Sequence, residues 1–160
     1  MLVQQTYHSP LGAITLASTK NALVGLWFQD QRYYGAHYQL NQIPSRLTKP
    51  IRLAENWLNQ YFAGQNPNPG VVPFQLEVTP FQKRVLTALQ QVPYGTTTTY
   101  GDLAMVVSTP AARAVGNAIG HNPISLLIPC HRVLGKHGQL TGYTGGLERK
   151  RALLQQEQRF

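Results

Sequence analysis

The first third of the chain contains two apolar runs and then a change of period. Residues 13–17 and 22–28 are apolar, with several β-branched or aromatic members, and the polar segment 18–21 separates them. Two such runs joined by a short polar turn predict a β-hairpin. Over residues 51–62 the apolar positions recur three and four residues apart, and Gly64 follows as a stop signal. This second pattern predicts a helix.

The second half carries helix-start signals of shorter range. Thr79 followed by Pro80 is typical of an N-cap and a first helical position, and it predicts a helix over residues 80–91. The buried side of this helix is expected to hold four apolar residues, Phe81, Val85, Leu86 and Leu89. Thr99 and Asp102 then have capping-box-like spacing, which predicts a short helix near residues 100–107.

A further helix is expected over residues 111–120, with Thr109 as its N-cap. Together with the short helix before it and the tight turn between them, it predicts a helix-turn-helix. Small residues dominate this second helix, and Arg113 is its one long charged side chain. The small residues fit either close packing in a core or close approach to a nucleic acid.

The last predicted helix covers residues 147–158. Its inner side is expected to hold three leucines, Leu147, Leu153 and Leu154. Glu157 falls on that same side by helical spacing. Its carboxylate is therefore either solvated at the edge of the helix or held inward by a partner such as His131. The glycine-rich loop 142–146 before this helix is a candidate ligand-binding segment.

Length and composition indicate a globular protein of one or two small domains, since the chain has 160 residues and 42% of them are hydrophobic. The turn-rich residues 66–73 predict a boundary that divides the chain into domains 1–76 and 77–160. One cysteine excludes an internal disulfide framework and a multi-cysteine zinc site. We therefore expect no metal, no cofactor and a reducing compartment.

No apolar run approaches the roughly 20 residues of a membrane span. We expect a cytoplasmic protein without a membrane partner. The formal net charge is +8, and it is unevenly placed: residues 1–79 hold five basic and three acidic residues, whereas residues 80–160 hold nine and three. Clustered lysine and arginine favour a polyanionic partner such as nucleic acid. The alternative is a surface that is merely basic.

Candidate chemistry is concentrated in residues 128–133, which contain the only cysteine, Cys130. Sulfur is a nucleophile as the thiolate, and the free thiol has a pKa of about 8.5, so a reactive cysteine needs a nearby base or cation. His131 and Arg132 are immediate candidates, and Pro129 stiffens the chain before the thiol. The alternative is an inert cysteine buried as a small apolar residue.

The hexapeptide Ile-Pro-Cys-His-Arg-Val at residues 128–133 resembles the signature of the O6-alkylguanine-DNA alkyltransferases, also called methylated-DNA–protein-cysteine methyltransferases. Further segments match in the family's order: residues 93–96, 99–101, 111–116, 122–123 and 143–147. The resemblance is continuous over residues 79–157 and looser over residues 1–65. It implies an α+β fold, with a small N-terminal α/β domain of ribonuclease H-like type and a mostly helical, winged-helix-like C-terminal domain.

The resemblance also implies an activity, the repair of double-stranded DNA by direct reversal. A methyl or larger alkyl group would pass irreversibly and stoichiometrically from O6-alkylguanine to Cys130, with O4-alkylthymine as a candidate second substrate. His131 would act as the base through a water, and Glu157 would orient its imidazole. Tyr100 would hydrogen-bond N3 of the leaving guanine, and Asn122 would brace the turn that carries the cysteine. The family implies a monomer without a cofactor.

The same resemblance assigns the contacts with DNA and with the base. The small-residue helix would enter the minor groove, and Arg113 would fill the gap left by a flipped nucleotide. The expected DNA-binding set is Arg113, Tyr100, Ala112, Gly116 and Thr99. The expected base-binding set is Val133, Tyr143 and Thr144.

Two other classes of function compete with alkyl transfer. A non-transferring module would bind DNA lesions without chemistry, but the relatives of that kind lack the cysteine, so Cys130 disfavours it. A cysteine hydrolase would use Cys130 and His131 on acyl substrates with turnover, and it would leave the helix-turn-helix and Arg113 unexplained.

Overall fold

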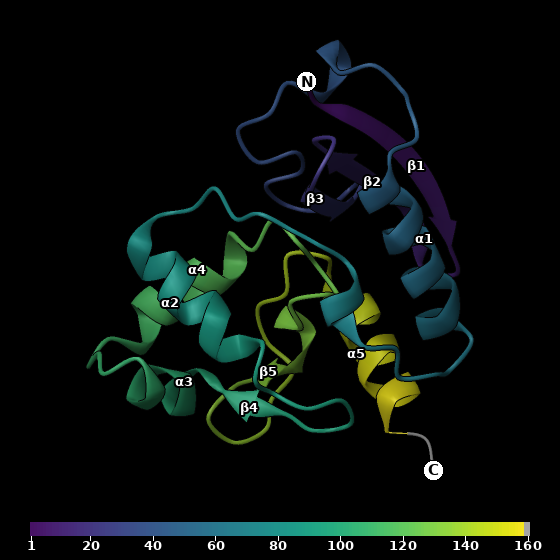
Figure 1. Ribbon diagram of the computed structural model, residues 1–160. Coiled ribbons are helices and arrows are strands. Elements are labelled where there is room, and N and C mark those ends of the chain that lie inside the picture. Colours follow the sequence, from purple (N-terminus) through teal and green to yellow (C-terminus); the bar gives the residue numbers. More distant parts are fainter. Residues whose placement is uncertain (159–160) are drawn as a thin grey trace. The chain divides into compact units, whose positions relative to one another are not determined.

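The computed structural model describes residues 1–158 and mixes strands with helices (Figure 1). The chain divides into two compact units, Met1–Glu77 and Val78–Phe160. The first unit is built on a small sheet and the second is mainly helical. The predicted α+β class is therefore confirmed.

The first unit contains a three-stranded antiparallel sheet in the order β1, β2, β3. The strands are β1 (Val3–Ser9), β2 (Gly12–Ser18) and β3 (Leu23–Phe28). Strands β2 and β3 form the predicted hairpin, in which Ile14 pairs with Phe28 and Leu16 pairs with Leu26. Strand β1 pairs along the whole of β2. The apolar pattern did not predict it as a strand of its own.

Helix α1 (Lys49–Phe62) packs on this sheet. It begins two residues before the predicted start, because the Thr48 hydroxyl caps it by accepting a hydrogen bond from the Ile51 N–H at 3.3 Å. The apolar stripe predicted from the sequence faces inward: Ile51, Ala54 and Leu58 are fully buried. Burial of this stripe is the main source of stability for the helix.

A second apolar cluster forms around Trp27 of β3, where it packs with Ala17 and Val24. The ring of Tyr34 meets the Trp27 ring edge-on at a centroid distance of 6.2 Å. Gly25 is required beside this ring, because a Cβ at that position would lie 1.8 Å from an atom of the Trp27 indole. Strand β3 is therefore buried along its whole length.

The second unit begins with α2 (Pro80–Leu89), whose start follows the predicted signal. Thr79 accepts a hydrogen bond from the Gln82 N–H at 3.2 Å, and the Gln82 side chain accepts one from the Thr79 N–H at 3.1 Å. This reciprocal capping box fixes the first turn. Of the four residues expected on the buried side, Val85, Leu86 and Leu89 are fully buried, whereas Phe81 is only half-buried.

Helices α3 (Tyr100–Val106) and α4 (Ala112–Gly120) follow, joined by a short connection. Thr99 caps α3 as predicted, accepting from the Asp102 N–H at 3.1 Å. The predicted cap of α4 is wrong, because Ala111 is the N-cap and it makes no side-chain capping bond. The Thr109 hydroxyl accepts instead from the Ala111 N–H, two residues on, and so closes a local turn ahead of the helix.

Two very short strands join distant parts of the second unit. Strand β4 (Thr98–Thr99) pairs in parallel with β5 (Val133–Leu134), and Thr98 is opposite Val133. Helix α3 begins directly after β4, and the short helical turn η3 (Cys130–Arg132) ends directly before β5. This pairing therefore brings the start of α3, at Tyr100, close to the segment that carries the cysteine.

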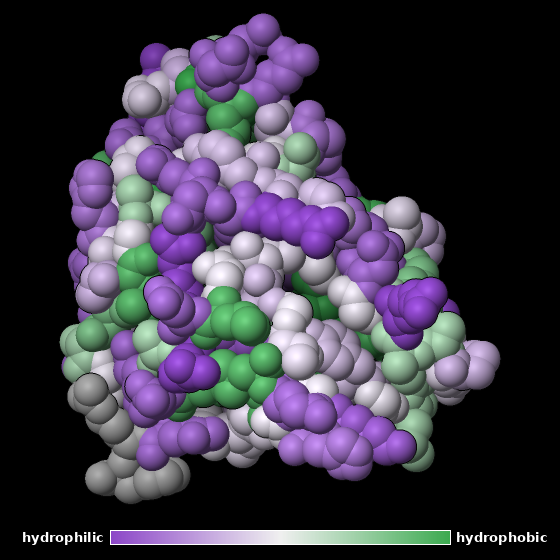
Figure 2. Space-filling model, turned by 180° about the vertical axis from the view of Figure 1, so that it is seen from behind, coloured by the Kyte–Doolittle hydropathy of each residue, from purple (hydrophilic) through white to green (hydrophobic). Residues whose placement is uncertain are grey.

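Helix α5 (Leu147–Glu157) packs against η3. Leu153 and Leu154 are buried as predicted, but the inward placement of Leu147 is wrong, since 46% of this residue is exposed. The burial pattern gives the reason: the first two residues of α5, Leu147 and Glu148, are exposed, and full burial begins at Lys150. On the face of the molecule in Figure 2, hydrophilic residues predominate and hydrophobic ones form small separate groups. None of the helices in residues 1–158 has the length and apolar character needed to cross a membrane.

Candidate active site around Cys130

The cysteine lies in an irregular segment, residues 122–133, in which every residue is buried. Backbone N–H and C=O groups in such a segment need partners, because water cannot supply them. Asn122 supplies two: its Nδ2 donates to the Ile128 carbonyl at 3.0 Å, and its Oδ1 accepts from the Ile124 N–H at 3.0 Å. Asn122 thus braces the loop that presents Cys130.

Leu126 adopts a left-handed backbone conformation inside this segment, with a φ of 72°. A β-carbon makes this conformation costly, by about 1–3 kcal/mol. The surrounding structure holds it in place, since the Leu127 N–H donates to the Ser125 carbonyl at 2.9 Å and the Ile128 N–H donates to the Ile124 carbonyl at 3.1 Å. Strain of this kind, compensated by local bonds, is typical of a segment that positions a functional group.

Cys130 is the first residue of η3, and only 3% of it is exposed. Burial raises the pKa of its thiol, because the charged thiolate is desolvated there. The Asn122 side chain, the charge of Lys150 and the Ser125 side chain act in the opposite direction and lower that pKa. The fold therefore buries the thiol but surrounds it with groups that favour its anion.

His131 is fully buried, and its Nε2 lies 2.6 Å from the Oε2 of Glu157. Burial lowers the pKa of His131, although the hydrogen bond to Glu157 and the charge of that residue raise it in part. The ionised carboxylate can only accept, so Nε2 carries the shared proton and Nδ1 keeps its lone pair. Among the described residues, Nδ1 of His131 has no hydrogen-bond partner.

Glu157 is buried near the end of α5 and is held by a second donor, Arg132. The Nε of Arg132 donates to Oε1 at 2.7 Å, and its Nη2 donates to Oε2 at 3.1 Å. Burial opposes ionisation of Glu157, but the bonds to His131 and Arg132 outweigh it and lower the pKa of this carboxyl to about 2. Of the two alternatives for Glu157, the one in which a partner holds its carboxylate inward is therefore correct. Arg132, which was a candidate partner of the thiol, instead binds this carboxylate.

Arg132 also links the cluster to the segment after α2. Its Nη1 donates to the Val92 carbonyl at 2.8 Å, and its guanidinium lies 5.6 Å from the centre of the Tyr94 ring. The guanidinium is thus fixed in one orientation by bonds on both sides. A rigid cation of this kind neutralises Glu157 without depending on solvent.

Tyr100, the first residue of α3, contacts the loop that precedes α5. Its hydroxyl donates to the Gly142 carbonyl at 3.1 Å and approaches the Thr141 carbonyl at 3.4 Å. Burial and the charge of Cys130 raise the pKa of Tyr100, and the side chain of Thr141 lowers it in part. The phenol therefore stays protonated and can act as a donor near the thiol.

Of the residues predicted to bind the base, Tyr143 lies against the same thiol. The Tyr143 hydroxyl is buried against Cys130, and burial, followed by the charge of Cys130, raises the pKa of Tyr143 well above its usual value. Thr144 follows it and is half-buried. Val133 is fully buried at the start of β5. The structure thus gathers these three residues, Tyr100 and the cysteine into one region of the second unit.

The residues predicted to contact DNA lie on the first turns of α4, apart from Tyr100 and Thr99. Ala112 and Arg113 are exposed, and Arg113 makes no hydrogen bond or ion pair with the described residues. Gly116 faces Tyr100, because a Cβ there would lie 3.7 Å from the ring of that tyrosine. The opposite face of α4 is buried through Val115, Ala118 and Ile119. One side of α4 is therefore buried in the core, and the other is exposed to solvent.

The sequence prediction missed one member of the cluster, Lys150, whose side chain is completely buried. Its Nζ donates to the Thr141 carbonyl at 2.7 Å. A signal was present: on α5, Lys150 precedes Leu153, Leu154 and Glu157 by three, four and seven residues. The spacing that placed Glu157 inward therefore also places Lys150 inward.

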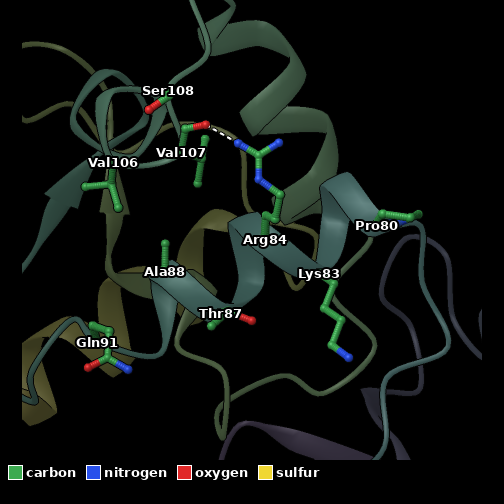
Figure 3. Close-up of a pocket in the computed structure, with 9 residues that line it drawn as sticks. All are labelled: Pro80, Lys83, Arg84, Thr87, Ala88, Gln91, Val106, Val107 and Ser108. Atoms are coloured by element: carbon green, nitrogen blue, oxygen red, sulfur yellow. Dashed lines mark hydrogen bonds between the residues drawn. The ribbon is translucent and has the colours of Figure 1, made fainter.

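A separate pocket of about 620 Å³ lies between α2 and the end of α3 (Figure 3). Lys83, Thr87 and Ala88 line one side, and Val106 and Ser108 line the other. Arg84 crosses it and donates to the Val107 carbonyl, which satisfies the end of α3. The pocket shares no lining residue with the cysteine cluster, and the bond between Arg84 and Val107 joins the two helices that precede α4.

A buried thiol followed by a histidine that is bonded to a carboxylate is typical of proteins that use cysteine as a nucleophile. Comparison with known families specifies the class. Residues 80–159 match the family model "6-O-methylguanine DNA methyltransferase, DNA binding domain". Residues 2–76 match the model "6-O-methylguanine DNA methyltransferase, ribonuclease-like domain".

Individual relatives agree with these matches. The methylated-DNA–protein-cysteine methyltransferase of Mycobacterium tuberculosis is 43% identical over 158 residues, which cover 98% of this chain and 93% of the relative. The protein of the same name from Haemophilus influenzae is 40% identical over 152 residues, which cover 94% and 83%. A crystal structure of Mycobacterium tuberculosis OGT in complex with DNA superposes with a TM-score of 0.86 at 43% identity, covering 97% of this chain and 92% of that one.

The chain belongs to the methylated-DNA–protein-cysteine methyltransferase family. The resemblance found at residues 128–133 is therefore confirmed, as is the class of enzyme, a DNA-repair methyltransferase that uses cysteine. A module that only binds lesions is not favoured, because the relatives that align with nearly the whole chain are named as transferases.

Proposed function

We propose that this protein repairs O6-alkylguanine in double-stranded DNA by moving the alkyl group onto the sulfur of Cys130. The observation that carries the proposal is the arrangement at η3. The buried thiol is followed by His131, whose Nε2 is held by Glu157 while its Nδ1 keeps a free lone pair. The first unit, 1–76, would act as a ribonuclease-like domain, and the second, 77–160, would carry both DNA binding and transfer.

The proposed reaction is an in-line displacement. His131 Nδ1 takes the thiol proton, directly or through a water, and the imidazolium is stabilised by Glu157. A sulfur lone pair then forms the bond to the alkyl carbon as the bond from that carbon to O6 breaks, and the bonding electrons pass to the guanine. A proton returned to the base leaves guanine and a neutral thioether. Atoms and charges balance without a cofactor.

The groups around the thiol support roles in holding the base. Tyr100, with its protonated phenol, would donate to N3 of the leaving guanine. The Val133 carbonyl, Tyr143 and Thr144 would bind the base in the pocket beside Cys130. Asn122 would keep the loop of Cys130 in place, as its two bonds to that loop support.

Helices α3 and α4 would act as a helix-turn-helix that reaches DNA through the exposed side of α4. The small residues Ala112 and Gly116 would let the helix backbone approach the minor groove. Thr99 would contribute at the start of α3. Arg113, exposed and without a partner among the described residues, would occupy the stack after the base is flipped out. The protein would act as a monomer in the cytoplasm, where a lone thiol stays reduced.

Single-turnover stoichiometry tests the proposed function. With duplex DNA carrying O6-methylguanine in excess, the product should plateau at one alkyl group per protein molecule, because a thioether is a poor electrophile and offers no route back to the thiol. A cysteine hydrolase would instead continue to turn over. Sustained repair beyond one equivalent would therefore reject the proposal.

Arg113→Ala should slow repair of duplex DNA by at least about tenfold, because the flipped state loses a group that offsets a few kcal/mol of unstacking. Reaction with a free O6-alkylguanine base should change by less than about threefold, since no flipping is needed. The two rates are measured side by side under single-turnover conditions.

The matched control is Arg151→Ala, which removes one exposed positive charge from α5 in the same unit. This variant should weaken repair only as far as one long-range charge does. If Arg113→Ala slowed both substrates equally, Arg113 would act on the chemistry or on stability, and the flipping role would be lost.

A further inference from the structure

Lys150 is a buried cation without an obvious counter-charge. Its side chain is 0% exposed and is one of the largest that are fully buried among the described residues. Its Nζ donates to the Thr141 carbonyl at 2.7 Å, and it forms no ion pair with the described residues. Burying an ammonium group costs several kcal/mol unless an anion compensates it. A position of this kind requires an explanation beyond packing.

The titratable groups that face Lys150 come from four places in the second unit. Cys130 and His131 belong to η3, and both interact electrostatically with Lys150. Tyr100 of α3 shares the Thr141 carbonyl with the ammonium, and Tyr143 follows on the same loop. Glu157 lies two turns further along α5.

Among these groups, only the cysteine can supply an unshared negative charge. Glu157 is already bonded to Arg132 through both oxygens and to His131 through one. The phenols of Tyr100 and Tyr143 stay protonated, because burial raises the pKa of each. The thiolate of Cys130 is therefore the counter-ion that the ammonium lacks.

We propose that Lys150 is a positioning residue for the transfer reaction: held on the Thr141 carbonyl, its ammonium stabilises the Cys130 thiolate. The proposal rests on the proposed function and adds a member to its site. Lys150 also determines the net charge of the cluster. Arg132 and Glu157 cancel, and His131 is neutral at rest, so the resting cluster carries one net positive charge from Lys150. When His131 takes the thiol proton, this net charge stays the same, and the new thiolate supplies the anion that the ammonium lacks.

The electrostatic interaction acts in both directions. Burial lowers the pKa of Lys150 to about 8, and the charge of Cys130 raises it in part. The same attraction lowers the pKa of the thiol, which burial otherwise raises. The two protons therefore titrate as a pair, and the thiolate and the ammonium each favour the other. A buried lysine of this kind favours the reactive form of the cysteine at a cost in stability.

The test compares Lys150→Met, which keeps the length and removes the charge, with Lys150→Arg, which keeps the charge. Transfer from a free O6-alkylguanine base is followed from about pH 6 to about pH 10. In Lys150→Met the rate at neutral pH should fall about tenfold, and the apparent pKa of the pH–rate profile should rise by about one unit. The deficit should shrink above that pKa, where the thiolate forms without help. Lys150→Arg should keep the wild-type profile.

Two controls separate charge from structure. Arg151→Met removes an exposed charge from the next position of α5 and should leave the profile unchanged. Thermal unfolding of Lys150→Met should give an equal or higher Tm, because an apolar side chain replaces a buried ammonium. The proposal would be overturned if the transfer rate of Lys150→Met were reduced by the same factor at every pH, or if it equalled the wild-type rate. It would also be overturned if Lys150→Arg, which keeps the positive charge, failed to keep the wild-type pH–rate profile.

Reaction of Cys130 with iodoacetamide over the same pH range repeats the comparison without any nucleobase. If Lys150→Met shifts this profile while the wild type transfers nothing from DNA or free base, the role of Lys150 stands and the proposed function fails. If the wild type transfers alkyl groups but neither profile shifts in Lys150→Met, the proposed function stands and the role of Lys150 fails.

Discussion

Replacement of Cys130 by alanine should abolish alkyl transfer completely while leaving DNA binding close to that of the wild type. The thiol is the only one in the chain, so no other residue can form a stable thioether. The proposed DNA contacts lie on α4 and at the start of α3, and none of them depends on the sulfur. Transfer is measured with labelled O6-methylguanine duplex, and binding is measured by titration of the same duplex.

Cys130→Ser provides the stricter comparison, because it keeps a polar atom of similar size in place of the thiol. A hydroxyl is a far weaker nucleophile at neutral pH, so transfer should again be undetectable. Any transfer by Cys130→Ala above the background reaction would mean that another side chain accepts the alkyl group. Loss of DNA binding in both variants would show that Cys130 contributes to the fold of the DNA-binding surface.

Glu157→Ala should destabilise the protein by about 3–5 kcal/mol, because it leaves Arg132 and His131 buried without their anion. Glu157→Gln keeps a hydrogen-bond acceptor for both and should cost less. It should also slow transfer at neutral pH, since a neutral amide supports the imidazolium less well than a carboxylate. Urea unfolding and single-turnover rates provide the two measurements.

The pH dependence gives a second check on Glu157. Its pKa is lowered to about 2 in the folded protein, so its contribution to stability is fully present above the ordinary carboxyl pKa. That contribution should be lost progressively as the pH falls from about 4.5 towards about 2. Glu157→Gln should remove this part of the acid slope. The matched control is Glu148→Gln, which changes an exposed carboxylate at the start of the same helix and should leave the slope intact.

The sequence predicted the start of a helix correctly where the capping side chain bonds to residues close to it in the chain. Thr79 and Gln82 are three residues apart and fix the start of α2 between themselves. Thr109 has the same chemistry but a different outcome, because its hydroxyl bonds the Ala111 N–H two residues on. Ser108, just before it, has a positive φ of 57°. The sequence alone does not predict which N–H such a hydroxyl will accept from, because that depends on the backbone path between α3 and α4.

Partners that are distant in sequence were harder to predict. Cys130 and His131 could be recognised from the resemblance and from their chemistry, and Glu157 from helical spacing. The partner of Arg132 could not be predicted, because adjacency suggested the thiol, whereas the fold of α5 brings both oxygens of Glu157 to one edge of the guanidinium. Lys150 was overlooked for another reason: a lysine in a helix is ordinarily solvated, and only the placement of η3 against α5 reveals why this one is buried.

The most direct test of the whole account is the mass of the peptide that contains Cys130 after reaction with duplex DNA carrying O6-methylguanine. The protein is incubated with a slight excess of the duplex, digested and analysed by mass spectrometry, with undamaged duplex as the control. The account predicts that this peptide alone becomes heavier by one transferred methyl group and that the DNA contains guanine in place of O6-methylguanine. An unmodified Cys130 peptide beside repaired DNA, or a methyl group on any other peptide, would contradict it.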